Sequence, residues 1–267
     1  MSERNRADGE RASEEATVLL APNAGPMTLD GTNSYVLRTP GSPSAIVVDP
    51  GPDDPAHLAR LAAAGPVELV LITHHHADHV AGAAAFAALV GAPTRAFDPE
   101  FCIGAEPLVD GETVRAAGLS LEVLHTPGHT ADSACFLVHG AAGPAMLTGD
   151  TILGRGTTII ADPDGALGPY LASLERLRAL AGPADGPVPA LPAHGPVLPD
   201  LVAICDAYLA HRAERLAQVR AALAELGADA SAEAVTDLVY HDTDASVRQA
   251  AEASVRAQLA HLRGGRS

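Results

Sequence analysis

The segment Thr-His-His-His-Ala-Asp-His at residues 73–79 constrains this chain more than any other feature. It directly follows an apolar run that reads as a buried strand. Because side chains alternate in extended backbone, we expect His74, His76 and Asp78 to point one way. We expect His79 to point the other way and to open the next helix. One short loop of this kind can supply ligands to two neighbouring metal ions, as two-metal hydrolysis requires.

Further metal-capable side chains occur downstream in similar settings. His129, Asp150 and His194 each follow an apolar segment and stand next to glycine or proline. This repetition favours a metal site over a polar loop with a chance histidine cluster. His75, inside the histidine run, is expected to be a loop residue or a hydrogen-bond donor to the ligands.

The spacing His-x-His-x-Asp-His, followed by His129, Asp150 and His194, resembles the full ligand set of the metallo-β-lactamase superfamily. The resemblance implies an αββα sandwich with the metals at one edge. It also implies how the ligands divide: His74, His76 and His129 on the first ion, Asp78, His79 and His194 on the second, and Asp150 bridging both.

The resemblance is closer to one family, β-lactamase-like protein 2. It rests on residues 22–35, 148–154 and 156–158 and on the pair His211-Arg212, and it extends from about residue 22 to residue 262. Eukaryotic members are mitochondrial endoribonucleases that act on single-stranded RNA, whereas many bacterial members are known only as hydrolases. The family ends in a winged-helix-like module, and this chain stops where longer relatives continue into the wing strands.

An all-histidine and aspartate ligand set implies two divalent ions, with zinc expected and manganese or iron compatible. A hydroxide bridging the ions would attack the substrate, and Asp78 and Asp150 are the expected catalytic residues that orient it. Cys102, Cys135 and Cys205 all lie outside the ligand motif, and their spacing predicts no disulfide framework.

Other residues are candidates for supporting the ligands or contacting substrate. Asp49, at a predicted strand end, is expected to buttress the metal loop, because metal-bound histidines need such partners. Asn33 lies in a Gly-Thr-Asn turn that could cover the site and donate to substrate. Tyr170 and His125 are possible substrate contacts, but residues of each kind more often have a plain structural role.

The net charge of the chain affects which kinds of substrate it can bind. The net charge is −16, and all 17 basic residues are arginine, which excludes a lysine Schiff base. No basic stripe of the kind that binds nucleic acid is visible. Arg155 and Arg212 are candidate phosphate contacts, but both are expected to be ordinary surface residues.

Three functions therefore stay open at this stage. The first is a dinuclear metal-dependent hydrolase that cuts single-stranded RNA. The second is a small-molecule thioester or lactone hydrolase, similar to glyoxalase II. The third is a non-enzymatic metal-bearing scaffold or regulatory protein.

We expect three parts along the chain: a disordered tail at 1–15, a catalytic domain at 16–200 and a helical module at 201–267. Strands are predicted at 34–37, 45–49, 67–73, 119–124, 133–138, 145–148 and 188–191, and helices at 55–64, 79–90 and 169–181. The module should contain helices over 201–226, from a Ser231 cap to about 240, and from an Asp244 cap to about 263. No secretory signal or membrane-spanning run is present, so a cytoplasmic location is expected.

Overall fold

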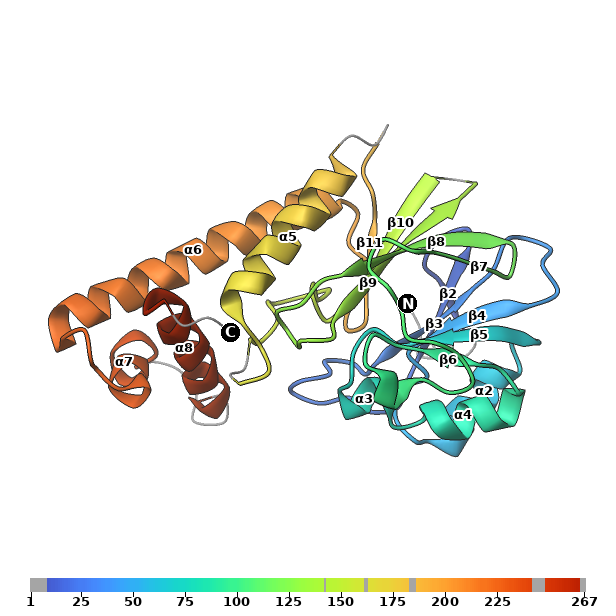
Figure 1. The fold of residues 1–267 in the computed structure, drawn as a ribbon, viewed down its shortest axis with the longest axis horizontal. Coiled ribbons are helices and arrows are strands. Elements are labelled where there is room, and N and C mark those ends of the chain that lie inside the picture. Colours follow the sequence, from blue (N-terminus) through green and yellow to red (C-terminus); the bar gives the residue numbers. More distant parts are fainter. Residues whose placement is uncertain (1–8, 142, 161–162, 183–185, 242–247, 265–267) are drawn as a thin grey trace.

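The computed structural model describes residues 9–141, 143–160, 163–182, 186–241 and 248–264. Two β-sheets pack face to face, helices cover their outer faces, and a group of helices extends away from the sheets (Figure 1). The predicted αββα sandwich is confirmed.

The first sheet has the strand order β1-β2-β3-β4-β5-β6. Its strands are β1 (Glu10–Arg11), β2 (Ala16–Leu20), β3 (Asn33–Leu37), β4 (Ala45–Val48), β5 (Val67–Leu71) and β6 (Thr94–Arg95). In β4, Ile46 and Val48 face the second sheet, whereas Ala45 and Val47 join the apolar cluster that contains helix residues Leu58 and Phe86. This alternation lets one strand serve the central core and the helical layer.

The second sheet has the order β11-β10-β9-β8-β7. Its strands are β7 (Thr113–Ala116), β8 (Leu119–His125), β9 (Ala134–Gly140), β10 (Gly143–Gly149) and β11 (Ala190–Pro192). Leu121 and Phe136 pack into the core between the sheets, while Leu124 and Met146 face the outer helices. Short β11 pairs in parallel with β10, which brings the residues after both strands to one edge of the sandwich.

The helix predicted at 79–90 is in fact two helices, α3 (Ala77–Val80) and α4 (Ala83–Val90). The interruption at Gly82 arises from a tertiary contact. The Gly82 amide donates to the Gly51 carbonyl, and a side chain at Gly82 would lie 2.7 Å from the Pro52 carbonyl oxygen. The remaining helix on this face is α2, Pro55–Ala62, and a short 3-10 helix follows at Pro99–Phe101.

The expectation of disorder over 1–15 is wrong for residues 9–15; residues 1–8 lie outside the described part of the chain. Glu10–Arg11 pairs antiparallel with β2, and Glu15 is buried. The Glu15 carboxylate accepts a hydrogen bond of 2.8 Å from the amide of Ala141, in the turn between β9 and β10. This long-range contact orders a segment whose composition alone resembles a tail.

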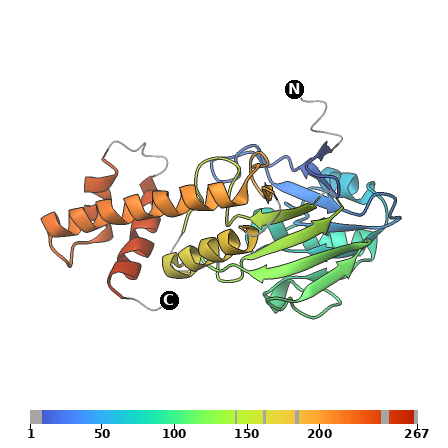
Figure 2. The same ribbon diagram turned by 90° about the horizontal axis from the view of Figure 1, so that it is seen from above.

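Helix α5 (Leu167–Ala181) and the first part of α6 (Leu201–Leu226) cover the second sheet. The rest of α6 continues beyond the sandwich to α7 (Ala232–Val239) and α8 (Arg248–Leu262), as Figure 2 shows. These three segments share a core of their own: Val219, Ala222, Val235, Val255 and Leu259.

Several predicted ends in this region are confirmed. Helix α6 has the predicted bounds and ends at Gly227, and the Ser231 hydroxyl caps α7 by accepting from the Ala234 amide. The predicted cap Asp244 lies outside the described residues. Within the described residues, no helix combines the length and apolar character needed to cross a membrane.

Candidate metal centre

The histidine loop follows β5 at the edge of the sandwich. Ile72 and Thr73 follow the end of β5 and are both buried, and α3 begins directly after His76. His74 and His79 are buried, whereas His76 and Asp78 are half-buried. The loop thus places two ligand candidates inside the protein and two at the solvent boundary.

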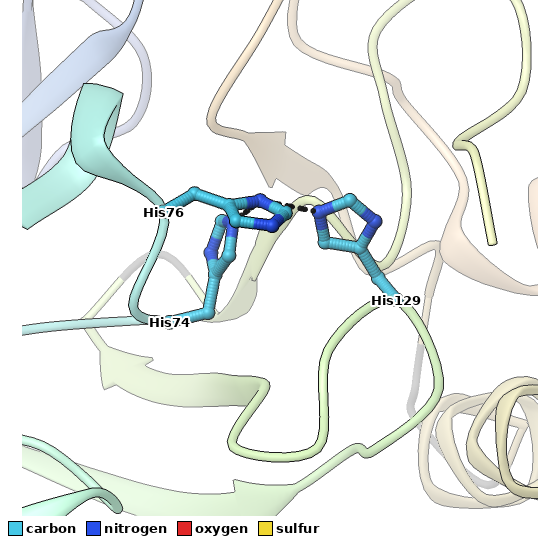
Figure 3. A group of neighbouring side chains, drawn as sticks. All are labelled: His74, His76 and His129. Carbon is cyan, nitrogen blue, oxygen red and sulfur yellow. Dashed lines mark hydrogen bonds between the residues drawn. The ribbon is translucent and has the colours of Figure 1, made fainter. Parts of the chain in front are cut away.

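Three imidazole rings form the first group, drawn in Figure 3. His74 and His76 come from the loop, and His129 comes from the segment after β8. His76 Nδ1 lies 3.0 Å from His74 Nε2 and 3.1 Å from His129 Nε2. Burial lowers the pKa of His74 well below its ordinary value, and burial followed by the nearby His129 lowers that of His76 to about 4. Neutral imidazoles are the form that binds a metal.

Asp78, His79 and His194 form a second group. Asp78 Oδ2 lies 3.1 Å from His194 Nε2 and 3.3 Å from His79 Nε2. Burial by itself would lower the pKa of His194, but the nearby carboxylates of Asp150 and Asp78 raise it to about 9. The two groups therefore differ electrostatically, because only the second contains a carboxylate of its own.

Asp150, in the turn after β10, lies between the two groups. Its Oδ1 is 3.4 Å from His194 Nε2 and 3.8 Å from His79 Nε2. Its Oδ2 faces the other way, 3.7 Å from His129 Nε2. One carboxylate is therefore oriented toward both groups.

The buried atoms of this cluster support a fit to metal ions. His79 Nε2, His194 Nε2 and Asp150 Oδ1 are buried without a hydrogen-bond partner among the described residues. A buried polar atom left unpaired costs about 1–3 kcal/mol, so three in one place need an explanation. Cations held by these atoms would satisfy all three, and imidazole with carboxylate is a donor set that divalent transition metals accept.

Asp49 supports the loop from behind. Its Oδ2 lies 2.8 Å from His79 Nδ1 and accepts from the Thr73 hydroxyl at 2.6 Å, while its Oδ1 accepts from the Thr73 amide at 2.8 Å. Burial alone would lower the pKa of His79, but the carboxylates of Asp49 and Asp150 raise it well above its ordinary value. Asp49 thereby turns the Nε2 edge of His79 toward the cluster.

His129 is held in a similar way from the other side. Its Nδ1 lies 2.8 Å from the carbonyl oxygen of Ile159 and 3.2 Å from the Thr158 hydroxyl. A carbonyl can only accept, so Nδ1 carries the proton and Nε2 keeps its lone pair for the cluster.

Comparison with known proteins identifies the family. The family model described as "Metallo-beta-lactamase superfamily" matches residues 27–189, more than half of the chain. The chain belongs to the metallo-beta-lactamase superfamily. As a member of this superfamily, the protein is a hydrolase.

Individual relatives agree with this assignment. The beta-lactamase-like protein 2 homolog of Caenorhabditis elegans is 33% identical, covering 95% of this chain and 85% of that protein. An atrochrysone carboxyl ACP thioesterase of Aspergillus terreus is also 33% identical, covering 81% of this chain and 66% of that protein. A metallo-beta-lactamase family protein of Thermus thermophilus has the same fold, with a TM-score of 0.75 and 23% identity over 95% of both chains.

The superfamily fold brings all the predicted ligand positions together, but some predicted substrate contacts lie elsewhere. Tyr170 is fully buried, and its hydroxyl donates to the Thr151 carbonyl, so its side chain lies in the kind of structural setting that the sequence favoured over a substrate contact. The Asn33 amide donates to the carbonyls of Pro192 and Gly195, on either side of His194. Asn33 therefore holds the His194 segment, and the side-chain donor expected to face substrate is already used.

The remaining candidates also have defined partners. His75 Nδ1 lies 2.8 Å from Asp132, and His125 Nε2 lies 2.9 Å from the Ala131 carbonyl. Exposed Arg155 forms an ion pair with Asp30, as a surface residue should. The expectation that Arg212 is a surface residue is wrong, because it is only 6% exposed.

The sequence marked residues 156–158 only as part of the family resemblance and gave the segment 157–159 no role beside the site. Its residues contact His129 on one side and helix α6 on the other, where Arg212 donates to the Thr158 carbonyl. The role of this segment could not be inferred from its residue types, because it depends on backbone carbonyls.

Proposed function

We propose that this protein uses two divalent cations to hydrolyse a carboxylic thioester. The observation that carries the proposal is the position of Asp150 between two groups of ligand atoms, where buried atoms of His79, His194 and Asp150 have no hydrogen-bond partner among the described residues. His74, His76 and His129 would hold one cation, and Asp78, His79 and His194 the other. Bound cations of this kind supply Lewis-acid polarisation of a carbonyl and a nucleophile at neutral pH.

The carboxylates have separate tasks in this proposal. Asp78, whose side chain is 27% exposed, can accept a hydrogen bond from a water that enters from solvent. Asp150, only 10% exposed, can orient the same water from inside the cluster. The nearby imidazoles of His194 and His79 outweigh the effect of burial and lower the pKa of Asp78, so it stays ionised at neutral pH.

Two observations support a thioester as the substrate. A relative at 33% identity is named an atrochrysone carboxyl ACP thioesterase. The net charge of −16 also disfavours a polyanionic substrate, because long-range repulsion would slow its approach. The helices beyond the sandwich would then shape the entrance to the site.

A second candidate function is cleavage of single-stranded RNA. The observation that favours it is the match to the beta-lactamase-like protein 2 homolog, which extends over 95% of this chain and thus includes the C-terminal helices. Because the chain is strongly acidic and its sequence shows no basic stripe, RNA binding would be weak and its salt dependence shallow.

One preparation of enzyme should decide between these substrates. We expect hydrolysis of a generic acyl thioester, lost with a chelator and restored by zinc or manganese, and slower turnover of a lactone and of nitrocefin. A labelled single-stranded RNA should be cleaved slowly or not at all. Asp150→Ala protein from the same purification controls for contaminating nucleases. Chelator-sensitive RNA cleavage without thioester turnover would reverse the order of the two candidates.

Metal content is an independent prediction. Protein purified without chelator should contain close to two transition-metal ions per chain, because two groups of ligand atoms share one carboxylate. Emission spectrometry gives both the number and the element. His129→Ala should lose metal, whereas the neighbouring His125→Ala should keep it, since His125 lies outside both groups. A value near zero in wild-type protein after zinc or manganese is added would exclude the metal centre.

A further inference from the structure

A separate pocket lies between the segment 157–159 and the C-terminal helices. Its volume is about 390 Å³. It contains none of the candidate metal ligands, although it adjoins the metal centre through the segment that contacts His129. Its polar lining includes Thr157, Thr158, His211, Arg212, Arg215 and Tyr240.

The charge of this lining differs from that of the whole chain. Arg212, Arg215 and His211 all come from one part of α6, and none of the described residues that line the pocket is acidic. Six other arginines form ion pairs with carboxylates: Arg95, Arg155, Arg176, Arg178, Arg248 and Arg256. Neither Arg212 nor Arg215 forms one with any described residue. Other described arginines also form no ion pair, so what sets Arg212 and Arg215 apart is that both line one pocket with no acidic residue among its described members.

Arg212 is held firmly in the pocket wall. One Nη donates to the Thr158 carbonyl, and the guanidinium lies 5.1 Å from the centre of the Tyr170 ring. Its Nε is buried without a partner among the described residues. A buried guanidinium without a counter-charge is costly, and an anion in the pocket would remove that cost.

Arg215 is also held in place, one helical turn further along α6. Its guanidinium lies 5.4 Å from the centre of the Tyr240 ring and donates to the Gln218 amide oxygen at 2.8 Å. His211 responds to both arginines: its pKa is lowered, first by burial and then by Arg212 and Arg215. The pocket therefore presents fixed positive charge.

We propose that this pocket binds a phosphate group of a small-molecule substrate whose reactive bond lies at the metal centre. Guanidinium groups match phosphate oxygens, and the hydroxyls of Thr157, Thr158 and Ser254 add short donors. Two arginines suffice for one or two phosphates. A nucleic acid would need a longer basic track than this acidic chain offers. The proposal does not depend on which bond is cleaved.

Binding of adenosine diphosphate to the full-length, zinc-loaded protein tests the assignment by calorimetry. We expect Arg215→Gln to weaken binding at least about tenfold, the effect of losing a charged hydrogen bond. Arg215→Lys should retain most of the affinity. Arg220→Gln, an exposed arginine further along α6 that does not line the pocket, should bind like wild type. Any adenosine diphosphate that binds at the metal ions does so in all variants, so it does not affect the difference in affinity between them.

A second readout locates the ligand. The His211 ring, observed by NMR, should titrate at higher pH when adenosine diphosphate is bound, because a nearby anion stabilises the imidazolium. Equal affinities for Arg215→Gln and Arg220→Gln, with an unchanged His211 titration, would overturn the proposal. Arg215-dependent binding of single-stranded RNA, without binding of adenosine diphosphate, would show that the pocket serves a nucleic acid instead. Because no turnover is measured, failure of the thioester assay would leave these results intact.

Discussion

Replacing Asp150 with alanine should abolish hydrolysis of every substrate that the enzyme accepts. The Asp150 carboxylate faces both groups of ligand atoms, with Oδ1 near His194 and Oδ2 near His129, so one substitution affects both groups. Metal ions stabilise the transition state of hydrolysis by several kcal/mol. Losing them should therefore lower the rate about a thousandfold or more. Steady-state kinetics and metal analysis on the same samples measure both effects.

The fold should survive this change. The apolar clusters on both faces of each sheet contain none of the ligand positions, so circular dichroism of Asp150→Ala should match that of wild type. Asp206→Ala, an exposed carboxylate on α6, is the control for removal of one negative charge. Wild-type turnover by metal-free Asp150→Ala protein would place the active site elsewhere.

Asp49→Ala should have the largest effect on stability. Its buried carboxylate contacts His79 Nδ1 and accepts hydrogen bonds from the amide and the hydroxyl of Thr73. Removing one partner of a buried charged pair costs about 3–5 kcal/mol, because the other partner stays buried and unpaired. We expect the free energy of unfolding to fall by this amount in urea denaturation of the chelator-treated protein. Metal affinity should fall about 10- to 100-fold, as is usual when such a supporting contact is lost.

Two variants test this explanation. Asp49→Asn should be intermediate, because an amide oxygen can still accept from the Thr73 amide but has no charge to pair with His79. Asp54→Ala removes only the cap of α2, where the carboxylate accepts from the His57 amide, and should cost about 1 kcal/mol. A loss for Asp49→Ala no larger than that for Asp54→Ala would mean that Asp49 does not hold the loop.

The sequence predicted seven of the strands because they are short apolar runs that end in turn residues, whereas the sandwich itself was implied by the resemblance to a known superfamily. It also predicted the convergence of His129, Asp150 and His194 on the histidine loop, since each follows a strand of the second sheet. Ligands at strand ends are local features of sequence, and the fold brings those ends to one edge. The division of the chain at residue 200 stays a prediction.

Contacts distant in sequence explain what was missed. The break between α3 and α4 comes from Gly82 against Gly51, and the order of residues 9–15 comes from Glu15 against Ala141. Neither contact has a local signature. The burial of Arg212, in contrast, had a signal that was overlooked: the buried positions of α6 are spaced three or four apart, and Arg212 falls on that stripe.

The segment 157–159 has a consequence for which molecules the enzyme accepts. It touches His129 with one side and Arg212 with the other, so the separation between the metal centre and the phosphate pocket is fixed by a few consecutive backbone units and one continuous helix. Neither the segment 157–159 nor helix α6 can shift alone without breaking these hydrogen bonds. Substrates would then be selected by length: a series of otherwise identical molecules, differing only in the number of bonds between the phosphate and the cleaved group, should show a single sharp optimum.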